Sequence, residues 1–168
     1  MEIRKIYFDM DSVLADFDKG VRELCGMEAQ DQEAPDPEQE NLMWERIRET
    51  EHFYDRLDLM PGAKEMFGRV YEKYGDRCEI LTGIPRKERG IVTAAEDKAE
   101  WTRRMLSDRV KVNTVRRRDK QKYCAGPEDV LIDDRIKTIN EWRNLGGTSI
   151  LHESAEKTLE ELEKRGLL

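Results

Sequence analysis

Short apolar runs alternate with longer amphipathic stretches along this chain. The apolar runs predict strands over residues 3–8, 78–81, 110–112, 130–132 and 148–151. The stretches between them predict helices over residues 62–74, 93–106, 135–145 and 154–165. Strands that alternate with helices are typical of a parallel sheet covered on both faces. The pattern therefore predicts an α/β fold, a three-layer Rossmann-like parallel sheet with its ligand site at the carboxyl ends of the strands.

The spacing of large apolar side chains also predicts which helix faces are buried. Ile136, Ile139 and Trp142 lie at helical spacing and predict the buried face of helix 135–145. Trp44 and Trp101 lie at helical spacing among apolar neighbours, so we expect both to be core residues rather than site residues.

Residues 18–60 interrupt the alternation. This stretch is rich in acidic residues, contains the run QDQEAPDPEQE and predicts one helix from about Asp36, a suitable N-cap, to Thr50. We expect a small helical cap, inserted after the first strand, in residues 18–60. The core domain would then comprise residues 1–17 and 61–168.

Composition narrows the class of protein. The chain has 168 residues and a formal net charge of −7 at pH 7. No apolar run approaches the roughly 18 residues of a membrane span, and the acidic start of the chain lacks the pattern of a signal peptide. Its three cysteines, Cys25, Cys78 and Cys124, have no CxxC spacing, which argues against a disulfide framework or a zinc site. We expect buried thiols and a cytoplasmic location.

Acidic side chains follow two of the predicted strands. Asp9 and Asp11 come directly after the first strand, and residues two apart in extended backbone point to the same side. Asp133 and Asp134 come directly after the fourth strand. Adjacent carboxylates at a strand end are electrostatically costly unless a cation lies between them and Asp9. Taken alone, however, Asp9 and Asp11 are more typical of a strand-end turn with solvated acids.

Two further features belong to the same edge of the predicted sheet. The second strand ends in Thr82 and Gly83, which offer a hydroxyl group and room for the close approach of an oxyanion. The run Arg116–Lys122 places several cations before the fourth strand. A basic surface loop or a nucleic-acid patch are the alternatives for this run, and the acidic net charge opposes the second of them.

The order of these features resembles the four motifs of the haloacid dehalogenase-like (HAD) phosphohydrolase superfamily. FDMDSVLADFD is similar to the first motif, LTG to the second, Lys120 to the third and LIDDR to the fourth. Within that superfamily, DMDSVLADF, HFYDRLDLMPGA, EDKAEW and RRRDK resemble segments of the 5′(3′)-deoxyribonucleotidase family. Ser12 stands where that family usually has glycine, and Gly83 stands where it tends to have serine.

The resemblance implies a Mg²⁺-dependent phosphomonoesterase that hydrolyses (deoxy)nucleoside 5′-monophosphates through an aspartyl-phosphate. In this scheme Asp9 is the nucleophile and Asp11 the general acid and base. The Mg²⁺ ligands would be Asp9, the backbone carbonyl of Asp11, and one or both of Asp133 and Asp134. The phosphate-binding groups would be Thr82, Gly83, Lys98 and Lys120, with Lys122 as a rival for the role of Lys120.

The substrate side of the prediction rests on three aromatic residues. Phe17, Phe53 and Tyr54 are candidates to stack on a nucleobase, with a role as core aromatics as the alternative. His52 is expected to be an exposed loop residue.

Other readings of the same motifs stay open at this point. Another small phosphate ester, such as a sugar phosphate, is the main alternative substrate. A phosphoacceptor receiver domain also uses acids, Thr and Lys around Mg²⁺, but in a different order along the chain. We expect a small-molecule phosphate monoester as the partner, without nucleic acid or membrane, and a homodimer is an option that the sequence leaves open.

Overall fold

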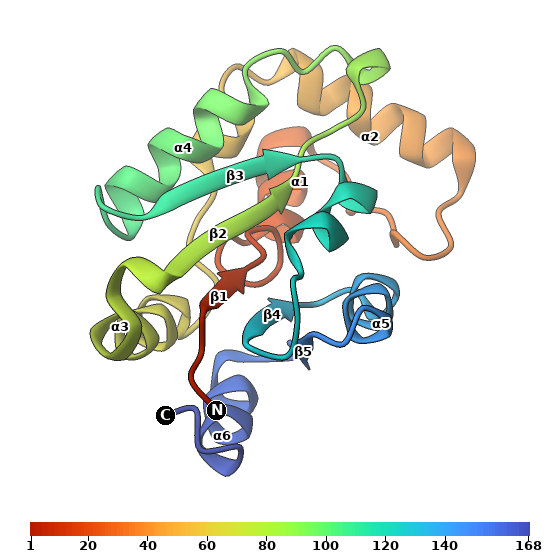
Figure 1. Ribbon diagram of the computed structural model, residues 1–168. Coiled ribbons are helices and arrows are strands. Elements are labelled where there is room, and N and C mark those ends of the chain that lie inside the picture. Colours follow the sequence, from red (N-terminus) through yellow and green to blue (C-terminus); the bar gives the residue numbers. More distant parts are fainter.

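The computed structural model describes residues 1–168 and confirms the α/β prediction (Figure 1). Its five strands form one parallel sheet in the order β3-β2-β1-β4-β5. The chain moves outward from β1 to β3 and then crosses to β4, so the order reverses beside β1. This reversal is the place where sheets of this kind bind ligands. The strands are β1 (Lys5–Phe8), β2 (Cys78–Gly83), β3 (Lys111–Val115), β4 (Asp129–Asp133) and β5 (Thr148–Leu151).

The strand order also decides against the receiver-domain alternative. Receiver domains have the order 2-1-3-4-5, whereas β1 here lies between β2 and β4. The phosphoacceptor reading is therefore excluded by topology.

The predicted helices are all present, each within two residues of its expected bounds. The prediction that Ile136 is buried is wrong. It is 44% exposed and starts its helix outside the buried face that Ile139 and Trp142 form. No helix is both long and apolar enough to cross a membrane. The helices of this part are α3 (Ala63–Tyr74), α4 (Ala94–Met105), α5 (Ile136–Asn144) and α6 (Ala155–Lys164), with short 3₁₀ turns η2 (Gly75–Arg77), η3 (Lys87–Arg89) and η4 (Arg117–Tyr123).

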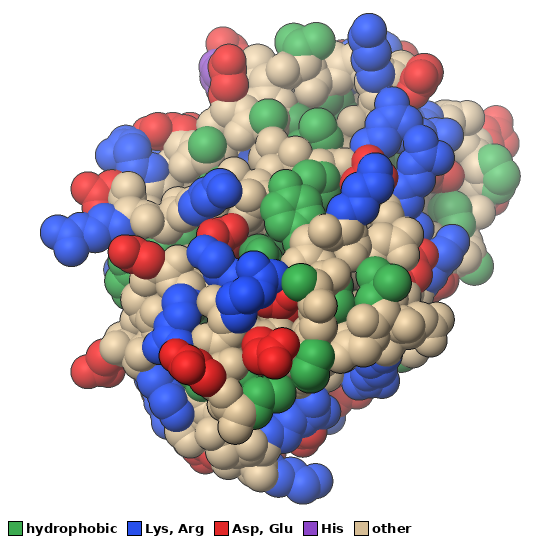
Figure 2. All heavy atoms as spheres, in the orientation of Figure 1, with side chains coloured by type: hydrophobic (Ala, Val, Ile, Leu, Met, Phe, Trp, Pro, Cys, Tyr) green, Lys and Arg blue, Asp and Glu red, His purple; other side chains and the backbone are tan.

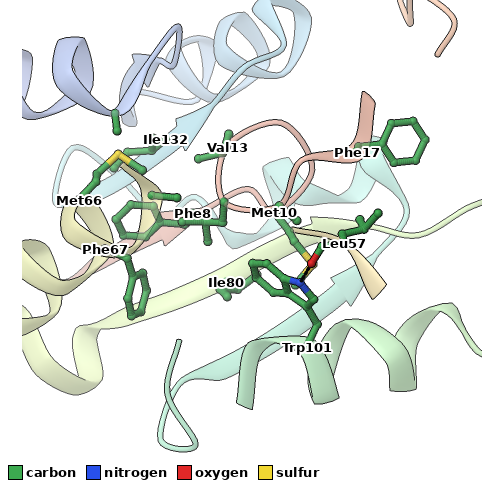
Figure 3. Packing of buried hydrophobic residues seen from close by; sticks show 14 of the residues in the cluster. Phe8, Met10, Val13, Phe17, Leu57, Met66, Phe67, Ile80, Trp101 and Ile132 are labelled. Atoms are coloured by element: carbon green, nitrogen blue, oxygen red, sulfur yellow. Dashed lines mark hydrogen bonds between the residues drawn. The ribbon is translucent and has the colours of Figure 1, made fainter. Parts of the chain in front are cut away.

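Alternate residues of the strands bury against opposite layers of helices. Phe8, Ile80 and Ile132 belong to the large cluster to which α3, α4 and α6 contribute. Figure 3 shows them with Met66 of α3 and Trp101 of α4. Tyr7 belongs to a second cluster on the other face, where Trp142 of α5 covers it. The period of two along each strand produces this division, and it confirms the three-layer prediction.

A helix that the sequence analysis did not predict follows the first strand. This helix, α1 (Phe17–Cys25), begins after Asp16, whose side chain accepts a hydrogen bond from the backbone N–H of Lys19 at 3.2 Å. It ends at Gly26, which adopts the left-handed conformation (φ 65°) that suits a helix C-cap. Its N-cap, its glycine stop and the spacing of its buried side chains were all readable, but the acidic residues around them obscured the pattern.

The predicted cap helix lies where it was expected. α2 (Pro37–Glu49) begins after Asp36, whose carboxylate accepts from two backbone N–H groups of the first turn. The short turn η1 (Phe53–Arg56) follows it. Met43 and Ile47 of α2 are buried in the same cluster as the sheet residues.

Ser12 occupies a strained position in the turn between β1 and α1. Its φ is 67°, in the left-handed region that non-glycine residues rarely adopt. Three successive N–H groups, those of Val13, Leu14 and Ala15, donate to the carbonyl of Met10 and hold the turn closed. The turn keeps Asp9 and Asp11 on the site side, and its backbone conformation explains why glycine suits position 12.

Candidate active site

Asp9 lies at the end of β1 and is almost buried, with 6% of its surface exposed. Its Oδ1 accepts a hydrogen bond from Lys120 Nζ at 2.7 Å. The same ammonium group donates to Asp133 Oδ2 at 2.9 Å, so one cation bridges the ends of β1 and β4. Coulombic attraction from these two carboxylates outweighs the effect of burial and raises the pKa of Lys120, which therefore stays charged.

Lys120 and Lys122 are clearly distinguished. The turn η4 directs Lys120 inward, where only 3% of its side chain is exposed, whereas the Lys122 side chain is 74% exposed and pairs with Asp119. The run Arg116–Lys122 thus divides into the inward-facing Lys120 and exposed cations such as Arg116, Arg118 and Lys122. This arrangement supports Lys120 over its rival.

A cluster of three carboxylates could hold a metal ion. Ligand oxygens of Asp9, Asp133 and Asp134 all lie within 4.8 Å of one another. Burial, followed by the charges of Asp9 and Asp133, raises the pKa of Asp134 to about 9. Lys120 supplies one positive charge to this group of three acids, so the cluster has the surplus negative charge that a divalent cation would balance. The oxygen-only donor set fits Mg²⁺, as the sequence predicts.

Lys98 has a different set of partners from the one expected for a phosphate-binding lysine. It is fully buried, and its Nζ donates to Asp11 Oδ2 at 2.9 Å, to Thr82 Oγ1 at 2.8 Å and to the Gly83 carbonyl at 2.8 Å. An ammonium group has three N–H donors, and these contacts use all three. Lys98 therefore orients Asp11, and the Thr82 hydroxyl faces Lys98 from beneath the pocket.

One oxygen of Asp11 remains available. Asp11 Oδ1 is buried and has no hydrogen-bond partner, while Oδ2 is held by Lys98. A buried carboxylate oxygen without a donor is energetically unfavourable in a resting site. Asp11 lines the pocket, so this unpartnered oxygen belongs to a residue of the site.

Asp9, Asp11 and Lys120 line a pocket to which residues of α1 and α2 also contribute. Of the three aromatic candidates, Phe17 and Tyr54 line it, whereas Phe53 does not and packs edge-on against both of their rings. Trp101 is fully buried, as expected. The prediction that Trp44 is a core residue is wrong, because its side chain lines the pocket and is only partly buried. The remaining cap residues of the lining are Gln30, Asp31, Gln32, Pro35, Glu40 and Met43.

Four arginines line the same pocket and were missed by sequence reasoning: Arg86, Arg89, Arg117 and Arg135. Arg117 lies 3.2 Å from Glu141, while Arg135 Nε is buried without a hydrogen-bond partner. Figure 2 shows Lys and Arg side chains gathered at the upper right, over the part of Figure 1 where α2 and η3 lie. Arg117 and Arg135 stand next to the third and fourth motifs, and that position was the available indication.

The three cysteines and His52 are not part of the carboxylate cluster. Cys25 and Cys78 are buried, and Cys124 is partly buried. His52 has a side chain that is 53% exposed, and it contacts Asp97 on α4.

Known structures share this fold. A hydrolase from Streptococcus pneumoniae TIGR4 has a TM-score of 0.53 at 15% identity, covering 97% of this chain and 100% of that chain. A phosphonoacetaldehyde hydrolase-like protein from Oleispira antarctica has a TM-score of 0.51 at 12% identity, covering 89% and 72%. A dehalogenase has a TM-score of 0.50 at 13% identity, covering 88% and 84%. At these identities the likeness is one of fold.

The fold and the carboxylate site together define a hydrolase of the HAD superfamily. No curated protein sequence is significantly similar to the chain. A family model, however, matches residues 2–165 and is described as 5′ nucleotidase, deoxy (Pyrimidine), cytosolic type C protein. The chain belongs to that family, and it is an enzyme of the phosphatase class, as the motifs predicted.

Proposed function

We propose that this protein is a Mg²⁺-dependent phosphomonoesterase that hydrolyses (deoxy)nucleoside 5′-monophosphates through an aspartyl-phosphate on Asp9. The observation that carries the proposal is the cluster of Asp9, Asp133 and Asp134, in which Lys120 bridges Asp9 and Asp133 and Asp9 lines a pocket with aromatic walls. Family membership supports a nucleotide as the substrate. The proposal includes residues 18–60 as the cap, a cytoplasmic location and no nucleic-acid or membrane partner.

A phosphate dianion and the Asp9 carboxylate repel each other, so the site must supply positive charge before attack. Two unit charges about 4 Å apart interact by roughly 4 kcal/mol at an effective dielectric constant of 20. Bound Mg²⁺, held by Asp9, Asp133 and Asp134 with the Asp11 carbonyl, would offset the charge of the phosphoryl oxygens. Lys120 contributes a permanent charge at the same point and keeps Asp9 fixed for attack on phosphorus.

Asp11 would handle the protons of both half-reactions. Its free Oδ1 would give a proton to the leaving 5′-oxygen when the phosphate transfers to Asp9. The same oxygen would then take a proton from the water that hydrolyses the aspartyl-phosphate. Lys98 holds the other oxygen through both steps, so the carboxyl group does not rotate away.

The nucleoside would occupy the pocket beside Phe17, Trp44 and Tyr54. Stacking of a base on aromatic side chains contributes roughly 1–3 kcal/mol per base in nucleic-acid sites. A sugar phosphate lacks the group that would use these rings. The aromatic lining therefore favours a nucleotide over the sugar-phosphate alternative.

A substrate screen tests the proposal. Purified protein is assayed for phosphate release from nucleoside 5′-monophosphates, deoxynucleoside 5′-monophosphates and sugar phosphates, with Mg²⁺ or with a chelator. We expect the highest kcat/KM with a nucleotide and no turnover with chelator. If a sugar phosphate exceeded every nucleotide, the nucleotidase assignment would be wrong.

Mg²⁺ binding is expected to release protons and to tighten as the pH rises. The pKa of Asp134 is raised to about 9, so without a cation this acid is protonated at pH 7 and must lose its proton to become a ligand. Calorimetry at pH 7 in buffers of different ionisation enthalpy should show up to about one proton released per ion. The apparent affinity should increase up to about pH 9 and then level off. Asp134→Asn is the control, and proton release that persisted in this variant would contradict the assignment.

Gly83→Ser is expected to strengthen substrate binding without disturbing the fold. A Cβ at this position would lie 3.6 Å from atoms of Arg117, an ordinary van der Waals contact. The serine hydroxyl would add one donor beside the phosphate, which corresponds to a KM lowered about two- to tenfold. Steady-state kinetics and thermal unfolding measure both effects, and a raised KM in a stably folded variant would contradict the proposed place of the phosphate.

A further inference from the structure

Three polar contacts fasten the turn η1 and its flanks to one face of α4. Asp97, Trp101 and Arg104 lie at helical spacing on that face. Trp101 Nε1 donates to the Leu57 carbonyl at 2.8 Å, the dashed contact in Figure 3. Arg104 Nη2 donates to Asp55 Oδ1 at 2.9 Å. The third contact joins Asp97 to His52, and it is the one that can change its charge in the neutral pH range.

In the contact between His52 and Asp97, the Asp97 carboxylate is buried and both of its oxygens are held. Asp97 is 5% exposed, and its Oδ1 lies 2.7 Å from His52 Nδ1. Its Oδ2 accepts from Thr93 Oγ1 at 2.8 Å, so both oxygens have donors. His52 has a φ of 51°, a left-handed conformation that is unfavourable for a non-glycine residue. Such a conformation persists where surrounding contacts determine it.

The residues next to this pair meet at the active site. Tyr54 follows His52 by two positions, is almost fully buried and lines the pocket. Lys98 follows Asp97 directly and holds Asp11. The Lys98 ammonium lies 4.5 Å from the centre of the Tyr54 ring, a cation–π contact. The His52–Asp97 contact and the Tyr54–Lys98 contact therefore join the same two segments at neighbouring positions.

We propose that His52 is a positioning residue, whose contact with Asp97 fixes Tyr54 against Lys98 and so shapes the nucleoside side of the pocket. The inference rests on the proposed function, because it concerns the leaving group of that reaction. His52 touches no reacting atom, and its effect should appear in nucleoside binding rather than in phosphoryl transfer. Lys98 keeps its three hydrogen bonds without His52, so Asp11 stays in place.

The charges around His52 determine the direction of its pH dependence. Asp97 faces it from α4, Glu51 and Asp55 come from its own segment, and Arg104 neutralises Asp55. The hydrogen bond to Asp97 is the main cause that raises the pKa of His52 above its ordinary value. A raised pKa means that the ion pair with Asp97 is complete at acid pH and is lost as the pH rises through the raised value.

Kinetics of His52→Gln provide the first test. We expect its KM for a nucleoside 5′-monophosphate to rise about three- to tenfold, with kcat within about twofold of the wild type. The ratio of the nucleotide KM to the ribose 5-phosphate KM cancels ionisation of the phosphate. This ratio should rise with pH above about 6.5 in the wild type and stay flat in the variant. Glu49→Gln, which changes an exposed side chain at the end of α2 that forms no hydrogen bond or salt bridge, is the matched control.

A proton NMR titration provides a readout that does not depend on turnover. The chain has only two histidines, so the His52 signals are identified by their loss in His52→Gln. In an Asp9→Asn background, a nucleoside monophosphate should raise the pKa of His52 further than inorganic phosphate does. By thermodynamic linkage, the additional change in the acid dissociation constant equals the factor by which protonation of His52 strengthens nucleoside binding. Inorganic phosphate fills the phosphate site alone and controls for its charge.

The outcomes separate this inference from the proposed function. If the nucleotide binds but shifts His52 no more than phosphate does, and KM in His52→Gln is unchanged, the positioning role is wrong and the proposed function stands. If kcat falls with KM unchanged, His52 acts on the chemical step and the inference is also wrong. If the wild type neither binds nor hydrolyses nucleotides, the proposed function itself fails and the inference fails with it.

Discussion

Asp9→Asn is expected to lower kcat by about 10⁴-fold or more, the scale of loss when a covalent nucleophile is removed. The neutral amide cannot attack phosphorus, and it also removes one of the three oxygen ligands proposed for Mg²⁺. The fold should survive, because asparagine matches aspartate in size and Lys120 keeps its second partner, Asp133. Phosphate release and metal affinity should therefore both fall in a protein whose thermal unfolding is close to that of the wild type.

Trapping the intermediate makes this test specific for the nucleophile. Acid-quenched wild-type protein, taken during turnover, should carry one phosphoryl group, and peptide mass spectrometry should place it on Asp9. Asp9→Asn should carry none. Asp108→Asn, which neutralises an exposed carboxylate outside the pocket, is the matched control and should retain turnover. Full activity in Asp9→Asn, or a phosphoryl group at another residue, would show that the covalent route is wrong.

The sheet and the motif positions were predictable because each depends on local features of the sequence. Buried parallel strands are short apolar runs, and the motif residues stand directly at their ends. Asp9, Lys120 and Asp133 are far apart along the chain, yet the observed strand order, in which β1 lies next to β4, brings them within hydrogen-bond distance. The cluster follows from the rule that carboxyl ends of parallel strands share one edge.

The cap was less predictable because its residues serve two purposes. Its many acidic residues make the apolar face of α1 hard to recognise in the sequence. The helical spacing of Trp44 predicts a core residue, whereas in the structure Trp44 lines the pocket. Likewise, Phe53 and Tyr54 are adjacent aromatics, and only their packing shows that one supports the pocket floor while the other lines it. Such differences depend on how the helix is placed over the sheet, which local periodicity does not encode.

Lys98 shows a third kind of limit. Sequence resemblance supplied the residue and its neighbourhood but not the direction of its three N–H groups. The structure directs them to Asp11, Thr82 and the Gly83 carbonyl, so this lysine orients Asp11, the acid and base of the proposed mechanism. Its charge still lies at the site, so it contributes to the field that a phosphate meets.

Asp11→Asn is expected to lower kcat for a nucleotide by about 10²- to 10⁴-fold, the range for loss of a general acid or base. Asparagine can still accept the hydrogen bond from Lys98, so the variant removes the proton transfer while keeping that contact. The loss should depend on the leaving group. A nucleoside alkoxide needs the proton that Asp11 supplies, whereas the nitrophenolate of p-nitrophenyl phosphate leaves without one.

Pre-steady-state kinetics can therefore separate the two roles of Asp11. With p-nitrophenyl phosphate, Asp11→Asn should release a burst of nitrophenolate close to one equivalent per enzyme and then slow down, because the second step still lacks its base. The nucleotide should give no burst, since its first step is blocked. Lys98→Met removes the group that orients Asp11 but leaves the carboxyl itself, so it should show a smaller loss with both substrates. Equal losses with both substrates and no burst would mean that Asp11 does not transfer the proton, because leaving-group dependence is the property that distinguishes an acid from a merely structural carboxylate.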